Sequence, residues 1–127
     1  MSGDRISMEL PARAEYGRVA RAAAANLALR RGYTLTEIDD LRLAMDEAVI
    51  ALLGPAAQDT AMSVAFDAEP ARVTVELAVL DGGDIPAERA ARFAEIAGGL
   101  VDFYEIDRER PKILLVKARD DHEDDGD

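Results

Sequence analysis

The sequence predicts an α/β two-layer sandwich, in which a mostly antiparallel, mixed sheet of four or five strands is covered on one face by three helices. Short segments in which apolar and polar residues alternate indicate strands with one buried face. Three longer segments repeat apolar residues at helical spacing. Along the chain these segments follow the order strand, helix, helix, strand, strand, helix, and then one or two strands.

The first strand and the first helix are predicted close to the N-terminus. Apolar residues alternate from Arg5 to Leu10, and Pro11 ends this strand. An alanine-rich segment from Glu15 to Arg31 predicts a helix that Gly32 closes. The buried stripe of this helix is predicted to consist of Tyr16, Val19 or Ala20, Ala23 and Leu27.

The longest helix is predicted from Thr34 to Gly54. Thr34 and Glu37 have the spacing of a capping box, and Gly54 followed by Pro55 is typical of a helix end. The predicted buried stripe consists of Ile38, Leu41, Met45, Ala48 or Val49, and Leu52. Asp46 and Glu47 lie next to that stripe. Two acids there are either the solvated edge of a packed helix or part of a functional site.

The second half of the chain supplies the remaining elements. Pro86 is expected to open a third helix, because proline is tolerated in a first turn. The buried face predicted for this helix consists of Ala90, Phe93, Ala97 and Leu100. The predicted strands are a segment around Met62 to Phe66, the clear alternation from Val73 to Val79, a short segment from Phe103 to Ile106, and Ile113 to Ala118.

Composition excludes several classes of function. The chain has no cysteine, and its single histidine, His122, lies in an acidic segment, so neither a thiolate metal site nor a histidine cluster is expected. A formal charge of −11 argues against nucleic-acid binding. With no signal peptide and no long apolar run, the expected location is the cytoplasm, without membrane contact. We expect one domain over residues 1–119 and a disordered acidic tail over 120–127.

Five arginines form the densest basic group of this acidic chain. They are Arg13, Arg18, Arg21, Arg30 and Arg31, and the helical spacing predicts that they lie on the exposed side of the first helix. Such a group is either a solubilising face or a face that binds an acidic partner. The acidic tail is either a solubilising extension or a segment that covers this arginine face in the free protein.

The run ARAEYGRVARAAAANLALRRGYTLTEIDDLRLAMDEAV resembles the start of the RsbW/SpoIIAB-type anti-sigma factors. These proteins are serine kinases with the GHKL (Bergerat, histidine-kinase-like) ATPase fold. The strand pair before Asp81 and the closing ILLVKAR also fall where that family has its sheet. The resemblance implies this fold over most of residues 5–118.

The family's ATP-binding helix motif is only partly matched. It has a glutamate that acts as the base and, four residues later, an asparagine that holds magnesium against the phosphates. Glu47 matches the glutamate, whereas Ala51 stands at the asparagine position and offers no oxygen. Because magnesium depends on oxygen ligands, the resemblance implies a vestigial base and no metal site.

The other two nucleotide-binding elements are also damaged or missing. Asp81 and Gly83 match the first half of the adenine-binding Asp-x-Gly-x-Gly turn, but Ile85 replaces its second glycine. Without the resemblance, this segment is an ordinary turn after a strand. No glycine-rich phosphate loop is present between Ile85 and Leu100.

The resemblance therefore implies an anti-sigma-factor-like binding protein that lacks kinase activity and needs no cofactor. Its expected partner is a sigma factor, an anti-anti-sigma protein or a related regulator. Arg18 falls at the arginine that relatives use for the sigma factor, and Arg13 and Arg21 flank it. Relatives are homodimers, so a dimer is expected. One alternative is an active kinase that binds Mg-ATP through Glu47 and Asp81. A second alternative is a small-molecule sensor.

Overall fold

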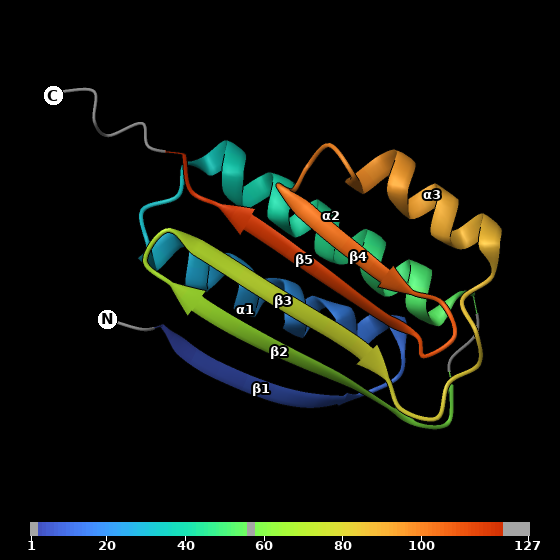
Figure 1. The fold of residues 1–127 in the computed structure, drawn as a ribbon. Coiled ribbons are helices and arrows are strands. Elements are labelled where there is room, and N and C mark those ends of the chain that lie inside the picture. The colour runs from blue at the N-terminus through green and yellow to red at the C-terminus, as the bar shows by residue number, and fades with distance from the viewer. Residues whose placement is uncertain (1–2, 56–57, 121–127) are drawn as a thin grey trace, which may run out of the picture.

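The computed structural model describes residues 3–55 and 58–120, which form a five-stranded sheet with three helices on one face (Figure 1). The strand order is β1-β2-β3-β5-β4, and the bounds are β1 (Asp4–Pro11), β2 (Ala61–Glu69), β3 (Arg72–Val79), β4 (Phe103–Asp107) and β5 (Lys112–Ala118). The helices are α1 (Gly17–Arg30), α2 (Leu35–Leu53) and α3 (Ala87–Ala97), and a 3-10 turn (Ala14–Tyr16) precedes α1.

All four strand pairings are antiparallel, so the sheet is not mixed. Every second residue of β2 and β3 points toward the helices and is buried, as are Ile113 and Leu115 of β5, which confirms the alternation in the sequence. The fully buried side chains of these strands are Met62, Val64, Phe66, Ala68, Val73, Val75, Leu77, Ile113 and Leu115. The core therefore lies between the sheet and the helix layer.

Helix α1 buries a stripe of small residues rather than the predicted stripe. The buried residues are Gly17, Ala20, Ala24 and Ala28. Of the predicted positions only the alternative Ala20 is buried, whereas Val19 is exposed and Tyr16, Ala23 and Leu27 are half-buried. The small stripe allows a close approach to α2, since a Cβ atom added at Gly17 would lie 3.1 Å from a methyl carbon of Val49.

Helix α2 begins and ends as predicted. The backbone N–H of Glu37 donates to the Thr34 hydroxyl at 3.1 Å, and the backbone N–H of Thr34 donates to the Glu37 carboxylate at 2.8 Å, which completes the capping box. Gly54 follows the last turn with a φ of 70°, a conformation that favours glycine. All the residues predicted for the inner stripe are buried.

Helix α3 lies beside α2, on the side of the sheet where β4 forms the edge (Figure 1). Its Phe93 and Ala97 are buried, and Phe93 meets Tyr104 of β4 edge to face, with ring centroids 5.5 Å apart. The other two positions predicted for its buried face, Ala90 and Leu100, are half-buried.

No helix among residues 3–55 and 58–120 is both long and apolar enough to cross a membrane.

Candidate functional site

Glu47 lies on the side of α2 that faces α3, and it is not part of a solvated edge. Its side chain is only 10% exposed, and its Oε1 atom lies 3.3 Å from Nη2 of Arg92 on α3. Asp46, the preceding residue, turns toward α1 and pairs with Arg21 at 3.0 Å. Asp46 thus connects α2 to α1, and Glu47 connects α2 to α3.

A second arginine of α3 covers the position of Ala51. The Nε atom of Arg89 donates to the carbonyl oxygen of Ala51 at 3.0 Å, close to the C-terminal end of α2. Its guanidinium also packs against Gly54, where an added Cβ atom would lie 2.6 Å from Nη1. A cation at this end of a helix is favoured because the last carbonyl groups carry partial negative charge.

The space between these groups is small. A cavity of about 100 Å³ is lined by Glu47, Ile50, Ala51, Arg89, Arg92 and Phe93. Pockets that hold small-molecule ligands usually measure roughly 300 to 1,000 Å³. The sequence did predict a buried Phe93, but the roles of Arg89 and Arg92 depend on how α3 packs against α2. The only indication of these roles in the sequence was the spacing of three residues between Arg89 and Arg92, which places both on one side of the predicted helix.

Asp81 and Gly83 do not line the cavity that holds Glu47. Asp81 is exposed with a φ of 54°, and it lines an open surface depression of about 410 Å³ together with Pro111 and Lys112. A Cβ atom added at Gly83 would meet no other atom within 4 Å. Ile85, at the position of the missing glycine, is fully buried. Asp81 and Glu47 therefore line two different cavities, which share no lining residue.

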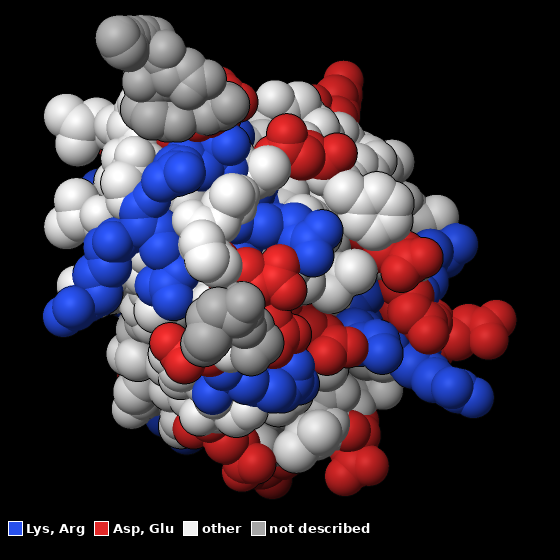
Figure 2. Space-filling model, turned by 60° about the vertical axis from the view of Figure 1, so that its left-hand side comes forward, with Lys and Arg blue, Asp and Glu red and all other residues white. Residues whose placement is uncertain are grey.

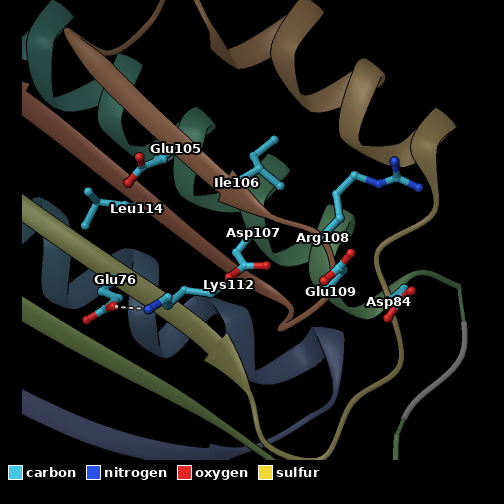
Figure 3. Close-up of a pocket in the computed structure, with 9 residues that line it drawn as sticks. All are labelled: Glu76, Asp84, Glu105, Ile106, Asp107, Arg108, Glu109, Lys112 and Leu114. Carbon is cyan, nitrogen blue, oxygen red and sulfur yellow. Dashed lines mark ion pairs between the residues drawn. The ribbon is translucent and has the colours of Figure 1, made fainter.

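A larger pocket of about 710 Å³ opens on the sheet face that lies away from the helices (Figure 3). Its lining residues are Glu76, Asp84, Glu105, Ile106, Asp107, Arg108, Glu109, Lys112 and Leu114. Lys112 pairs with Glu76 at 3.1 Å. None of the site residues predicted from the sequence lines this pocket. Its five carboxylates against two cations disfavour a phosphate-bearing ligand.

The five arginines predicted to share one exposed face are separated by the fold. Arg13, Arg18 and Arg30 are exposed, and Arg18 makes no hydrogen bond or ion pair with any described residue. Arg21 is half-buried beside Asp46. Arg31 is only 19% exposed, and it donates to the backbone carbonyl groups of Ala68 and Glu69 at the end of β2. The prediction of a common exposed face is therefore wrong for Arg31, which holds β2 against the end of α1.

The described chain ends beside the C-terminal end of α1. The backbone N–H of Asp120 donates to the Glu37 carboxylate at 2.9 Å, and Arg119 donates to the carbonyl oxygen of Arg31 at 2.9 Å. The rest of the predicted acidic tail lies outside the described residues. Figure 2 shows this side of the molecule, where lysine and arginine side chains form a band that acidic side chains flank.

Comparisons with known proteins agree with the resemblance seen in the sequence. No family model matches the chain. Serine-protein kinase RsbW of Bacillus subtilis (strain 168) is 43% identical over 47 residues, which is 37% of this chain and 29% of the relative. The matched part therefore spans less than a third of that kinase.

A solved structure shows the fold. The RsbU and RsbW domains of Rv1364c from Mycobacterium tuberculosis match 91% of this chain and 32% of the solved chain, with a TM-score of 0.62 and 16% sequence identity. The chain thus has an RsbW-type, GHKL-like fold, and the predicted layering of sheet and helices is confirmed.

Proposed function

We propose that this chain is an anti-sigma-factor-like binding domain that captures a sigma factor or a related regulator and does not transfer phosphate. The observation that carries the proposal is the pair of α3 arginines that contact Glu47 and Ala51, the two positions at which the kinase relatives are expected to hold their base and their metal ligand. The RsbW-type fold supports the kind of partner.

The chemistry of these contacts argues against a magnesium nucleotide. Magnesium requires oxygen ligands in near-octahedral geometry, and Ala51 offers only a carbonyl that already accepts the Arg89 hydrogen bond. The carboxylate of Glu47, which a kinase would use as a base, forms an ion pair with Arg92 at 3.3 Å. The guanidinium groups of Arg89 and Arg92 thus place positive charge beside Ala51 and Glu47, and the cavity between them measures only about 100 Å³.

The N-terminal end of α1 is the surface we assign to the partner. Arg18 is exposed and has no partner among the described residues, so its guanidinium remains available for a carboxylate on another protein. Arg13, in extended backbone just before the 3-10 turn, is also exposed. Arg21 contributes less, because it already pairs with Asp46. Charges of this kind govern the rate and specificity of association.

The second candidate function is an active serine kinase that phosphorylates an anti-anti-sigma protein. The match to a serine-protein kinase over 47 residues and the retention of Glu47 favour it. This function requires the side chain of Arg92 to release Glu47 before a nucleotide could bind.

One experiment separates the two candidates. The chain is used to capture its partner from an extract of the native cell, and the washed complex is incubated with radiolabelled Mg-ATP. We expect a stoichiometric complex in which neither protein gains phosphate. Label transferred to the captured protein, and lost when Glu47 is replaced by Gln, would establish the kinase and refute the proposal. Failure to capture any regulator would refute both.

A further inference from the structure

Strand β5 is apolar on both of its faces. Ile113 and Leu115 are buried against the helices. The alternation of the strand turns Leu114 and Val116 to the opposite, open face of the sheet. A strand with one solvated face normally alternates apolar with polar residues, whereas a continuous apolar run is typical of a strand that is covered on both faces. The composition of β5 therefore indicates that its outer face is also covered.

No element of the described chain covers that outer face, because the three helices lie together on the other side of the sheet (Figure 1). Phe103 of β4 lies directly opposite Val116, and it is 51% exposed. The outward residues of β3 beside Val116 and Leu114 are Thr74 and Glu76, which are polar. Phe103, Leu114 and Val116 thus form an outer strip that is apolar and is confined to β4 and β5.

The outer strip continues into the pocket of about 710 Å³, which Leu114 helps to line (Figure 3). The strand pairings place Leu114 between two carboxylates, Glu105 of β4 on one side and Glu76 of β3 on the other. The volume lies within the range of pockets that hold ligands. The other carboxylates that line this pocket are Asp84, Asp107 and Glu109.

The negative charge of the pocket is only partly balanced by its own cations. Lys112 pairs with one carboxylate at 3.1 Å, and the Nε–H of Arg108 donates to a backbone carbonyl at 2.9 Å. The remaining carboxylates include three that make no hydrogen bond or ion pair with any described residue, and these are Asp84, Glu105 and Glu109. A cation from outside the described chain can therefore pair with them.

We propose that the outer strip and this pocket together bind a segment of another protein in which arginine or lysine accompanies apolar residues. The apolar side chains of the segment cover Leu114, Val116 and Phe103, and its cations pair with the carboxylates beside Leu114. Arginine and lysine suit this surface because each has an apolar stem and a charged end. The proposal does not depend on the capture of a regulator, since Arg18 belongs to the helix layer on the other face of the sheet.

The charges of this surface disfavour other classes of occupant. Nucleic acids and membrane surfaces present phosphate groups, which the carboxylates repel. A second copy of the chain docked face to face would bring identical carboxylates together, and like charges across an interface are unfavourable. A small polyamine would pair with the carboxylates, but it would leave Phe103 and Val116 uncovered. A segment that is both apolar and basic satisfies the whole surface.

The test is a selection of random short peptides, displayed on phage, with the immobilised wild-type chain as the target. The library is first depleted on the double variant Glu105→Lys/Leu114→Thr, which removes peptides that bind elsewhere on the chain. Threonine is chosen because it favours the strand conformation. We expect the enriched peptides to combine arginine or lysine with leucine, isoleucine, valine or an aromatic residue.

A synthetic copy of an enriched peptide then measures the two parts of the surface separately. Its dissociation constant should rise at least about tenfold for Glu105→Lys and for Leu114→Thr. The matched control is Glu95→Lys, which makes the same charge change at an exposed position of α3 and should bind the peptide as the wild-type chain does. Arg18→Glu should also bind the peptide normally, which separates this surface from the one assigned to the regulator. Cooperative melting of each variant confirms that it is folded.

Each of the other results overturns the proposal. Enrichment of acidic peptides, of purely apolar peptides or of none would show that the surface does not recognise such a segment. An equal loss of affinity for Glu95→Lys would show that only the net charge matters. Spermidine that binds the chain as tightly as the peptide and displaces it would make the pocket a polyamine site. A mass in solution that falls when Glu105 is replaced by Lys would assign the surface to a second copy.

Discussion

At the scale of single residues, buried polar side chains in this fold connect elements that are distant in sequence. Tyr33, at the α1–α2 connection, donates its hydroxyl to the carbonyl oxygen of Lys117 on β5 at 2.6 Å. Glu47 connects α2 to Arg92 on α3. Each contact provides a partner for a buried polar group that is costly to leave unpaired. Removing either contact should therefore change the free energy of unfolding measurably.

Burial raises the pKa of Tyr33 to about 12. The neutral hydroxyl is therefore favoured in the folded chain, whereas an exposed tyrosine in the unfolded chain ionises near 10. The contribution of this group is fully present below pH 10 and is lost as the pH rises from about 10 to about 12. We expect the free energy of unfolding to fall over that window in urea titrations. Tyr33→Phe should lower stability by about 1 kcal/mol at neutral pH and weaken the alkaline decline.

The matched control for Tyr33 is Tyr104→Phe, which removes a hydroxyl from a half-buried ring on β4. This variant should keep the alkaline decline of the wild-type chain. If Tyr33→Phe declined as steeply as the wild type, the titrating group would be another residue.

Replacing Arg92 with Ala leaves the buried carboxylate of Glu47 without its cation. We expect a loss of about 1 to 2 kcal/mol in urea unfolding, a moderate value because the arginine itself is half exposed. The double variant Glu47→Gln/Arg92→Ala should recover part of the loss. The exposed Arg110→Ala is the control and should be neutral. Equal stability of all four chains would show that the pair contributes nothing to the packing of α3.

At the scale of elements, the sequence predicts the buried face of a segment when its apolar residues lie on one side only. Four strands were predicted to within one residue of their ends, whereas β2 ends three residues later than predicted. Alternation in β2 and β3 leaves one possible inner face. The capping box fixed the start of α2. In α1 alanines occur on several sides of the helix, so periodicity did not distinguish the buried stripe from its neighbours. Only the packing of α1 against α2 determines that face.

The α1–α2 contact itself predicts a steric effect. Ala24 is fully buried within the small-residue stripe, so Ala24→Leu should overpack the contact and lower the free energy of unfolding by about 1 to 3 kcal/mol. Ala22→Leu places the same side chain on the exposed side of α1 and should leave stability within about 0.5 kcal/mol. Denaturant titration of both variants measures the two losses. A larger loss for Ala22→Leu than for Ala24→Leu would contradict the buried face of α1 seen in the structure.

At the scale of the whole molecule, the fold and the candidate site differ in what the sequence could show. The layering followed from the order of the elements and from the resemblance together. The departures from the family, Ala51 and Ile85, were also visible in the sequence. The covering of Glu47 and Ala51 by α3 was not, because it depends on contacts between residues about 40 positions apart. The separation of the arginine group was hidden for the same reason.

Replacing Arg18 tests whether the proposed surface captures the partner. Arg18→Glu should abolish capture of the regulator from a native extract, because it places a carboxylate where the proposed contact needs a cation. The melting temperature should change by no more than about 2 °C, since Arg18 is exposed and contacts no described charge. Arg110→Glu makes the same change at an exposed position of the β4–β5 turn and should still capture the partner. Unchanged capture by Arg18→Glu would remove this arginine from the proposed interface.

The measurement that tests the central claim most directly is the melting temperature of the chain with and without saturating Mg-ATP. A ligand present at a hundred times its dissociation constant stabilises a protein by about 2.7 kcal/mol, which raises the melting temperature of a domain of this size by about 10 °C. We predict no shift, because two arginines already occupy the contacts beside Glu47 and Ala51. A clear rise with Mg-ATP that Glu47→Gln reduces would contradict the account.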